Sequence, residues 1–336
     1  MLLQPPSMAS MHQLPELQLS TTPQPDCPFI RTYYENHRPN AALKPQDEAL
    51  ILKEKMFLSF FQIGIFETYQ FLYQECRDAA HFKEWLIELK GPEMHLKSMQ
   101  DFNKWLRADP AEDVMPLPQL LDEAQMDSWA KNGYLKISGM LPAQDCEAVV
   151  TFIKTSLGIQ DDDPKTWYQP HQLLQGMMFQ QYQAACIQKI RHNANLKAVF
   201  SQLYGGKNIV PNAEKLSYNP PENNQYRFAG SPLHWDIDFS KGIQYHIQGL
   251  IYLNDVPAER GALTVIPGFH HEIEAYLAGS TNPEMAIEKL RRENRQVAIA
   301  GQKGDLIVWL EALPHAASPN HSNQPRFVQY VSFSLL

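Results

Sequence analysis

The stretch of sequence that decides the fold class lies in the second half of the chain and reads Pro-Leu-His-Trp-Asp over residues 232–236. Of the 12 histidines, His234 is the one that an aspartate follows two positions later, at Asp236. Residues i and i+2 of a β-strand point to the same face, so this imidazole and this carboxylate are placed to bind one metal ion together. Two ligands do not complete a metal site, and a third must come from another strand.

His315 is the best candidate for the third ligand, because it follows the apolar, strand-like run Leu306–Trp309. Two histidines and one carboxylate that leave three coordination positions open form the facial triad of non-haem Fe(II) sites, where a co-substrate and O2 bind together. Arg326 comes eleven positions after His315 and opens another strand-like run. Arginine suits bidentate binding of a carboxylate. The pattern therefore predicts an iron site that binds a keto acid with a second, distant carboxylate.

Four separated blocks of the sequence resemble the phytanoyl-CoA dioxygenase family of Fe(II)- and 2-oxoglutarate-dependent oxygenases. In chain order the blocks are Asn132–Leu135, Pro232–Asp236, Gly261–His270, and the stretch that runs from Gly304–Trp309 through Leu313–His315 to Gln324–Arg326. The resemblance extends over roughly residues 120–336 and does not reach residues 1–115. It adds an expected fold and an expected activity to the metal-site pattern.

The resemblance implies that His234, Asp236 and His315 are ligands of Fe(II), and that Arg326 binds the far carboxylate of 2-oxoglutarate. The implied activity is that of a dioxygenase, which converts 2-oxoglutarate to succinate and CO2 while it hydroxylates, or otherwise oxidises, a C–H bond of a small organic molecule. Asp236 argues against halogenation, because halogenating relatives carry a small residue in its place. One departure from the family is Ala317, where members often carry a small hydroxyl residue.

The sequence after Gly206 predicts a β-rich domain, because short strand-like runs follow one another between Gly, Pro, Asn and Asp residues. These runs are 214–218, 243–253, 262–266, 296–300, 306–309 and 327–333. Helical patterns occur around 120–131, 142–157 and 283–295. We therefore expect an α+β protein, with a double-stranded β-helix (jelly roll) and flanking helices over residues 116–336.

The first third of the chain predicts two further regions. Eight of the 25 prolines fall in residues 1–45, and we expect a disordered or loosely ordered arm over residues 1–44. Apolar residues at helical spacing predict a helical N-terminal region over residues 45–115, in which the first helix begins at Pro45 and continues to about Tyr73. Its aromatic face is expected to be buried, as is usual for amphipathic helices.

Several further residues are candidates for contacts with 2-oxoglutarate. Gln248 and Tyr252 share one face of the run 243–253, which is expected to form a wall of the keto-acid pocket. Lys215 precedes the iron motif and is a candidate hydrogen-bond donor to the keto acid, with solvent exposure as an equally good interpretation. His246 could line the cavity, but a place in the core or at the surface is the favoured interpretation.

Two other polar clusters are interpreted as structural. His270 and His271 are adjacent, and adjacent residues of a strand face opposite ways, so a shared metal site is disfavoured. The four basic residues between Lys289 and Arg295 are typical of a solvated helix face. Binding of a phosphate-bearing substrate is the less common alternative for these basic residues.

Composition and charge narrow the classes of partner. The chain has 29 Lys and Arg residues against 37 Asp and Glu residues, a formal net charge of −8, which disfavours nucleic acid as a partner. The four cysteines form no Cys-x-x-Cys pair, and the N-terminus lacks the pattern of a signal peptide. No uncharged run reaches the ~18 residues of a membrane span. We therefore expect a cytoplasmic protein whose partners are a small-molecule substrate and O2, with no signal for an oligomeric state.

Three alternatives stay open on the sequence alone. A zinc hydrolase or a metal-dependent isomerase could use the same two histidines and aspartate, but neither needs Arg326. A jelly-roll protein that has kept a non-catalytic remnant of the site is a second alternative, which the intact ligand set disfavours. The third is a partner-binding or scaffolding protein whose helical N-terminal region is its main functional part.

Overall fold

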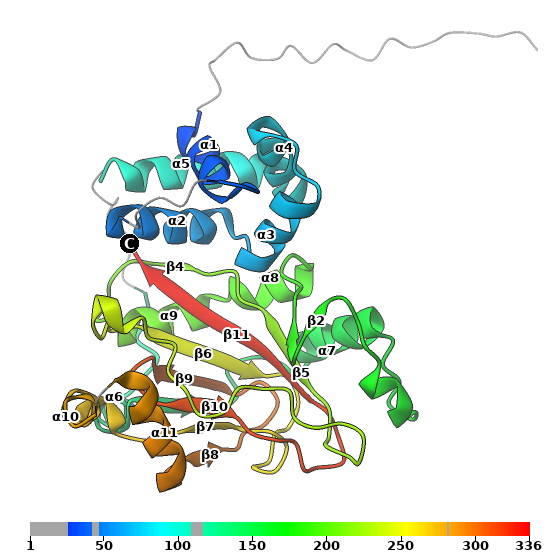
Figure 1. The fold of residues 1–336 in the computed structure, drawn as a ribbon, viewed down its shortest axis with the longest axis vertical. Helices are drawn as coiled ribbons and strands as arrows, with labels where there is room; N and C mark the ends of the chain where they lie inside the picture. The colour runs from blue at the N-terminus through cyan, green and yellow to red at the C-terminus, as the bar shows by residue number, and fades with distance from the viewer. Residues whose placement is uncertain (1–25, 42–46, 109–116, 281) are drawn as a thin grey trace, which may run out of the picture.

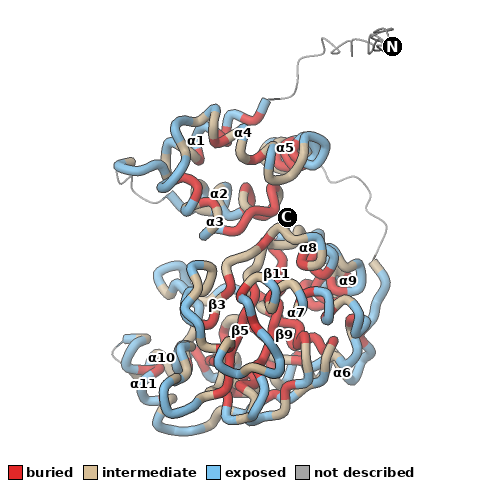
Figure 2. Tube along the Cα trace, turned by 90° about the vertical axis from the view of Figure 1, so that its right-hand side faces the viewer, coloured by how far each residue is buried: buried red, intermediate tan, exposed pale blue. Residues whose placement is uncertain are grey.

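The computed structural model describes residues 26–41, 47–108, 117–280 and 282–336, which form an N-terminal helical half and a larger sheet half (Figure 1). The helical half contains α1 Pro28–His37, α2 Glu48–Phe61, α3 Ile65–Gln74, α4 Ala79–Lys90 and α5 Pro92–Leu106. Buried residues gather in two separate cores, one in each half (Figure 2). No helix in the described ranges is long and apolar enough to cross a lipid bilayer.

The first long helical run forms two helices, α2 and α3, where a single helix was expected. Asp47 caps α2 by accepting a hydrogen bond from Ala49 N at 3.1 Å. Gln62 has a left-handed conformation with φ of 51°, and its N–H bonds back to Leu58 O and Ser59 O, which ends α2. Both helices then contribute aromatic side chains to the core of the helical half.

Helix α1 lies inside the segment that was expected to be a loosely ordered arm, and it corrects that expectation. Phe29, Ile30 and Tyr33 recur at helical spacing and are buried. Tyr33 packs on Phe57 of α2 with ring centroids 4.8 Å apart, and the burial of such an aromatic stripe offsets the entropy lost on ordering the segment. Most of the remaining arm lies outside the described residues.

The sheet half is built on two antiparallel sheets with flanking helices, which confirms the α+β class. Its strands are β1 Tyr134–Ile137, β2 Leu174–Gln175, β3 Met178–Phe179, β4 Ile209–Pro211, β5 Leu216–Asn219, β6 Ile247–Tyr252, β7 Leu263–Val265, β8 Val297–Ile299, β9 Leu306–Leu310, β10 His315–Ala317 and β11 Arg326–Leu335. The larger sheet has the order β1-β9-β6-β11-β5-β3-β2, with β4 also paired to β11, and the smaller sheet has the order β10-β7-β8. The predicted strand runs overlap with β5, β6, β7, β8, β9 and β11.

Helices cover the outer face of the larger sheet and the ends of the strands (Figure 1). They are α6 Glu123–Asn132, α7 Ala143–Leu157, α8 Ala185–Arg191, α9 Ala194–Leu203, α10 Ile273–Ala278 and α11 Pro283–Glu293, with short 3-10 helices η1 Pro164–Tyr168, η2 Phe239–Lys241 and η3 Phe269–His271. Phe200 of α9 packs on Phe333 of β11 with ring centroids 4.7 Å apart. A Cβ at Gly249 of β6 would lie 2.8 Å from the Phe200 ring, so this glycine allows α9 to approach the sheet closely.

Side-chain contacts between the sheets show which face of the larger sheet is the inner one. Tyr252 Oη of β6 donates to Ile299 O of β8 at 2.8 Å and accepts from Leu263 N of β7 at 2.9 Å. Gln248 shares this inner face by the two-residue period of the strand. The register of β11 against its neighbours places Arg326 on the inner face as well. The predicted site residues of the larger sheet therefore all point toward the smaller sheet.

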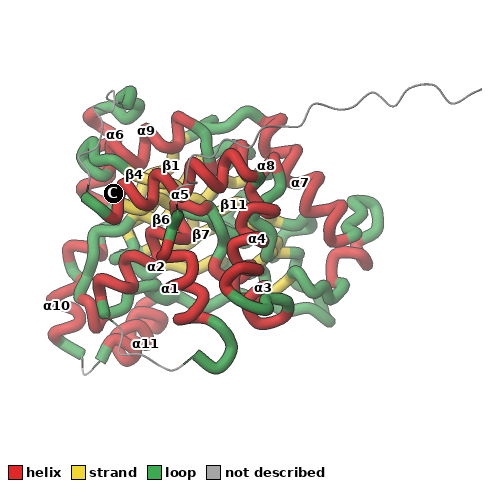
Figure 3. Tube along the Cα trace, turned by 90° about the horizontal axis from the view of Figure 1, so that it is seen from above, coloured by secondary structure: helices red, strands yellow, loops and turns green. Residues whose placement is uncertain are grey.

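The helical half packs on the sheet half where α2 runs beside β4 (Figures 1 and 3). Ser59 Oγ of α2 donates to Asn212 Oδ1 at 2.6 Å. Lys90 Nζ donates to Gln183 Oε1 at 2.6 Å, and Gln183 Nε2 donates to Glu67 Oε1 at 2.5 Å. These hydrogen bonds from α2, α3 and α4 hold the helical half against the sheet half.

Candidate active site

The three predicted metal ligands meet at the start of β10. His234 and His315 form an isolated antiparallel pair, with His234 N to His315 O at 3.0 Å and His315 N to His234 O at 2.9 Å. The carboxylate oxygens of Asp236 lie 3.5 Å from His234 Nε2 and 3.4 Å from His315 Nε2. One ligand atom from each residue lies within 4.8 Å of the others. Among the described residues, these two histidines and one aspartate have the geometry to hold a metal ion.

The backbone determines how the two imidazole rings are turned. His234 Nδ1 lies 2.8 Å from Pro232 O, and His315 Nδ1 lies 3.1 Å from Leu313 O. A carbonyl oxygen only accepts hydrogen bonds, so each Nδ1 carries a hydrogen and each Nε2 presents its lone pair toward Asp236. Two lone pairs that face a carboxylate repel it unless a proton or a metal cation lies between them. The arrangement therefore fits a divalent metal ion.

Asp236 is kept ionised although it is partly enclosed. Burial raises the pKa of Asp236, but when a proton lies between each Nε2 atom and the carboxylate, hydrogen bonds from His234 and His315 outweigh this effect and hold the pKa well below its usual range. The hydrogen bond to Asp236 raises the pKa of His234, against the opposing effect of burial. An ionised carboxylate beside two histidines provides the negative charge that a metal-ligand set needs.

The triad lies on the wall of a cavity of about 290 Å³. Strands of both sheets line this cavity, and the lining residues include Met178, Lys215, Gln248, Leu263, Trp309 and Ser332. A volume of this size admits a small molecule next to the triad. The cavity is therefore the place where a co-substrate and a substrate would reach a metal ion.

Two of the residues predicted to contact the co-substrate, Gln248 and Lys215, line this cavity. Gln248 Nε2 donates to Asp236 Oδ2 at 2.6 Å, and Gln248 Oε1 has no partner among the described atoms. The Lys215 ammonium lacks an ion-pair partner in the part of the chain that the structure describes. Gln248 therefore orients the carboxylate of the triad, whereas Lys215 is available to a ligand in the cavity.

The variant Gln248→Leu is expected to bind Fe(II) about 10- to 100-fold more weakly than the wild type, which is the usual effect of losing a partner of a metal ligand. Asp236 loses its donor at 2.6 Å and is no longer held toward the two histidines. A metal titration of the apoprotein measures the effect, with Gln244→Leu as the control because Gln244 is exposed on the same segment. Unchanged affinity in Gln248→Leu, or an equal loss in the control, would contradict this role.

Arg326 is fully buried, and its guanidinium donates to Gly261 O and, at 3.0 Å, to Ser217 Oγ. The Nε–H of Arg326 has no partner, and no carboxylate of the described residues forms an ion pair with this side chain. A buried guanidinium without a counter-ion is costly in free energy. The surroundings of Arg326 therefore fit an anionic ligand such as the carboxylate of a keto acid.

Gly261 gives Arg326 its closest acceptor. The φ of Gly261 is +67°, in the left-handed region that favours glycine, and a Cβ here would lie 2.5 Å from Asn219 Nδ2. Any other residue would be strained and would push on the strand that faces Arg326. The glycine at this place in the third sequence block is therefore explained by the backbone and by the lack of space.

Tyr252 lies on the inner face but does not line the cavity, which corrects its expected place in the wall of the pocket. Its Oη is engaged with the backbone of Ile299 and Leu263, so the side chain joins the two sheets. Burial raises the pKa of Tyr252 to about 12. The two-residue period identified the correct face, but the depth of the residue depends on the second sheet.

Trp309 is a site residue that no sequence pattern indicated. It lines the cavity, and its ring centroid lies 5.4 Å from that of His315. Its Nε1–H is buried without a partner among the described atoms. Trp309 faces the cavity because it pairs with Gln248 in the register of β6 and β9. The sequence of β9 alone does not indicate this position, because it depends on the pairing of β9 with β6.

The structure also places the other histidines and the basic run that the sequence singled out. His246 lines the cavity, which corrects the favoured expectation of a place in the core or at the surface, and burial lowers its pKa to about 4. His270 and His271 lie in the 3-10 turn η3, and both Nε2 atoms are 3.0 Å from the same backbone carbonyl, which agrees with a structural role. Arg291 Nε donates to Leu233 O at 2.9 Å, so this member of the basic run supports the triad segment instead of only facing solvent.

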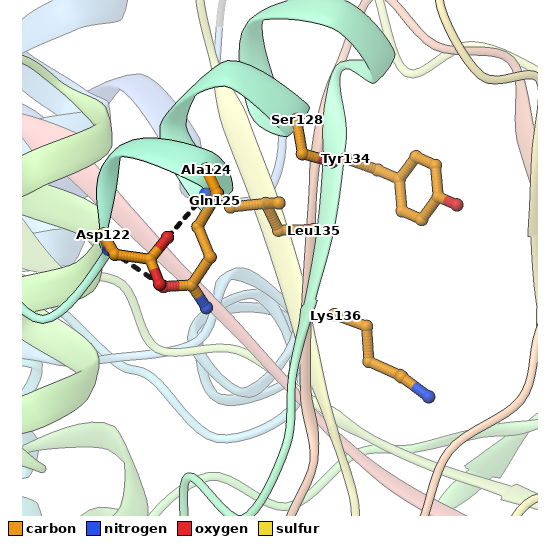
Figure 4. Close-up of a pocket in the computed structure, with 7 residues that line it drawn as sticks. All are labelled: Asp122, Ala124, Gln125, Ser128, Tyr134, Leu135 and Lys136. Atoms are coloured by element: carbon orange, nitrogen blue, oxygen red, sulfur yellow. Dashed lines mark hydrogen bonds between the residues drawn. The ribbon is translucent and has the colours of Figure 1, made fainter.

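A second pocket, of about 410 Å³, lies between α6 and β1 and contains none of the triad residues (Figure 4). Asp122 accepts from Gln125 N at 2.8 Å, and Gln125 Oε1 accepts from Asp122 N at 3.0 Å. These polar groups are thus satisfied as a helix cap. Tyr134 and Lys136 project from the other side of β1 (Figure 4). The capped start of α6 therefore accounts for the polar groups of this second pocket. The candidate active site is the cavity between the sheets.

Two histidines and one carboxylate in a cavity between antiparallel sheets are typical of a mononuclear non-haem metalloenzyme. The chain belongs to the phytanoyl-CoA dioxygenase family, whose family model matches residues 129–328. It is therefore a non-haem dioxygenase with Fe(II) as its metal and 2-oxoglutarate as its co-substrate, which acts with O2 on a small molecule. The helical half lies outside the range of this match.

Relatives of the chain are similar at low sequence identity. A protein of Dictyostelium discoideum that is named as a phytanoyl-CoA dioxygenase is 24% identical over 253 residues, which covers 59% of this chain and 71% of the relative. The methylphosphonate hydroxylase of Gimesia maris is 23% identical over 226 residues, which covers 64% of this chain and 82% of the relative. SnoK, a non-haem α-ketoglutarate-dependent carbocyclase of nogalamycin biosynthesis, superposes with a TM-score of 0.48 at 15% identity, and the match covers 66% of this chain and 87% of SnoK.

Proposed function

We propose that the chain hydroxylates a C–H bond of a small organic molecule, and that its sheet half is a double-stranded β-helix, or jelly roll. The observation that carries the proposal is the convergence of His234, Asp236 and His315 in one cavity, with both Nε2 atoms turned toward the carboxylate. In this proposal the three residues are the iron ligands, and they leave coordination positions open for the co-substrate and O2.

Fe(II) and 2-oxoglutarate, when bound, supply the oxidising chemistry, with succinate and CO2 as co-products. Arg326 binds the far carboxylate of the keto acid, because it is a buried cation without a counter-ion. Lys215 lies on the cavity wall and donates to the same co-substrate. Gln248 keeps Asp236 in the orientation of a ligand. The buried anion site at Arg326 also distinguishes this function from that of a zinc hydrolase.

The volume of the cavity and the name of one relative narrow the choice of substrates. Its volume of about 290 Å³ suits a small molecule in addition to the co-substrate only if that molecule is compact or extends toward the opening. One relative is named for methylphosphonate, which is a small anion. Small anions are therefore the first compounds to test as substrates of this chain.

The function is tested by adding Fe(II) and 2-oxoglutarate to the purified chain without O2. We expect a weak charge-transfer absorption band in the visible region that neither component gives alone. Admission of O2 should then consume 2-oxoglutarate and form succinate, slowly in the absence of a substrate. A wild-type protein that gives no band with both components would refute the proposed function.

A further inference from the structure

The cavity of the triad has a second carboxylate on its wall besides that of Asp236, and it belongs to Glu214. Glu214 Oε1 accepts a hydrogen bond from Ser332 Oγ at 2.6 Å. Ser332 is buried and also lines the cavity, and it lies on the inner face of β11 because it pairs with Gln248 of β6. The hydrogen bond therefore places the Glu214 carboxylate on the inner face of the larger sheet, at the cavity.

Glu214 lies close to the triad through this pair of strands. Gln248 and Ser332 are directly opposite each other on β6 and β11, and the Cβ atoms of such a pair are about 5 Å apart. Gln248 Nε2 donates to Asp236 Oδ2 at 2.6 Å, and Ser332 Oγ donates to Glu214 over the same distance. A compact molecule that contacts Glu214 at one end therefore reaches the triad with the other.

A series of hydrogen bonds holds the Glu214 carboxylate in place. Ser332 Oγ accepts from Asn212 Nδ2 at 2.8 Å, and Asn212 Oδ1 accepts from Ser59 Oγ of α2 at 2.6 Å. The backbone of Glu214 is bonded as well, with its N–H donating to Asn212 O at 3.1 Å. A binding group that is already oriented loses little entropy when a ligand arrives. The helical half thus helps to prepare this part of the cavity wall.

The Glu214 carboxylate has an acceptor left for a ligand. Its second oxygen, Oε2, accepts no hydrogen bond from the described residues, and none of their lysine, arginine or histidine nitrogens lies within 4.0 Å of the carboxylate. Oε2 is not one of the atoms that are buried without a partner, so it is accessible. A carboxylate only accepts hydrogen bonds, and its strongest partners are cationic donors. Glu214 therefore fits a positively charged group.

The group that Glu214 accepts is not supplied by the co-substrate. 2-Oxoglutarate is a dianion, and a carboxylate repels it. The cations proposed for 2-oxoglutarate lie on another part of the wall, because Arg326 donates to Ser217 Oγ at 3.0 Å and Lys215 lies two positions before Ser217. Glu214 is thus left for the primary substrate.

We propose that Glu214 binds a positively charged nitrogen of the primary substrate, and that the substrate class is therefore compact amines. This role rests on the proposed function, because it requires the triad cavity to be the place where the substrate is oxidised. Among the small anions that are the first compounds to test, those that also carry an ammonium group are favoured, and simple amines join them. Glu214 is in this sense a specificity-determining residue for the reaction.

The experiment measures binding of matched probes, without O2, to the full chain loaded with Fe(II) and 2-oxoglutarate. The first pair is β-alanine and propionate, and the second is propylamine and propan-1-ol. Within each pair the first probe carries an ammonium group and the second does not. At least one ammonium probe is expected to bind, with a dissociation constant about tenfold or more below that of its partner, as one charge-assisted hydrogen bond provides.

The variant Glu214→Gln is expected to bind that ammonium probe about 10- to 100-fold more weakly. Glutamine keeps an oxygen for the hydrogen bond from Ser332, but it removes the charge and places an NH2 group where the cation would lie. Glu214→Asp keeps the charge on a shorter side chain, so its affinity should fall between those of the wild type and Glu214→Gln. Thermal unfolding of the proteins shows whether they are comparable.

The matched control is Glu259→Gln. Glu259 is an exposed glutamate of the sheet half and does not line the cavity, so this variant should bind the ammonium probe as the wild type does. An equal loss in Glu259→Gln would mean that the total charge of the protein, and not a contact at Glu214, attracts the probe. That result would refute the role of Glu214.

The charge-transfer band of the same samples separates failure of this role from failure of the proposed function. If the wild type gives the band but no ammonium probe binds better than its partner, or Glu214→Gln binds it equally well, the role of Glu214 is refuted and the proposed function stands. If Glu214→Gln loses the band together with the probe, Glu214 supports the whole site and the role is again refuted. A wild type without the band refutes the proposed function itself.

Discussion

The variant His315→Ala is expected to lose the anaerobic charge-transfer band and the formation of succinate from 2-oxoglutarate. His315 supplies one of the three proposed protein ligands, and its loss should weaken Fe(II) binding by more than ~100-fold, beyond the usual effect of losing a ligand's partner. The fold should persist, because the backbone bonds between His315 and His234 do not involve the side chain. A metal titration and the absorption spectrum measure the result, and circular dichroism checks the fold.

The matched control for this variant is His271→Ala. His271 is also a histidine of the sheet half, but its Nε2 lies 3.0 Å from a backbone carbonyl and it takes no part in the triad. The control should keep both the band and the turnover of 2-oxoglutarate. A band of wild-type strength in His315→Ala would show that the iron is bound elsewhere and would overturn the ligand assignment.

The variant Arg326→Met is expected to bind 2-oxoglutarate roughly 10- to 100-fold more weakly while its affinity for Fe(II) stays close to that of the wild type. Hydrogen bonds to a charged group contribute ~1.5–3 kcal/mol, which corresponds to this loss of affinity. Methionine fills much of the space and removes the buried cation, whose Nε–H lacks a partner among the described residues. Titrations of Fe(II) and of 2-oxoglutarate, done separately, measure the two affinities.

A second variant keeps this prediction testable if Arg326→Met folds poorly. Arg326→Lys retains the charge but offers fewer donors in a different geometry, so its affinity for 2-oxoglutarate should fall between those of the wild type and Arg326→Met. Thermal unfolding of all three proteins shows whether they are comparable. Equal losses of Fe(II) and 2-oxoglutarate binding in either variant would mean that Arg326 supports the whole site and does not bind the keto acid.

The positions of the triad could be predicted from the sequence because each has a local signal. The His-x-Asp spacing places His234 and Asp236 on one face of an extended segment, and His315 follows an apolar run that forms the buried strand β9. The structure brings these three residues together within 4.8 Å. The order and spacing of the four sequence blocks likewise predicted the family, which the match over residues 129–328 shows.

The roles of the residues around the triad could not be told apart from the sequence. From the sequence, Gln248, Tyr252 and Lys215 are all candidates for contacts with the co-substrate, because strand periodicity identifies a shared face but not a depth. In the structure, Gln248 meets Asp236, whereas Tyr252 is engaged by the smaller sheet, and Trp309 joins the cavity wall through its pairing with Gln248. These differences depend on which strands become neighbours, and strand pairing joins residues that are far apart in the chain.

By itself, the sequence determined the α+β class, the family and the choice of His234, Asp236 and His315 as residues that come together, because these depend on residue types at short, fixed spacings. Only the tertiary structure decided the inner face of the larger sheet, the unpaired burial of Arg326 and the order of α1. It also decided that α2 lies against the wall of the cavity. The physical reason is that burial and charge compensation are properties of the packed chain, in which residues far apart in the sequence, such as Ser217 and Arg326, become neighbours.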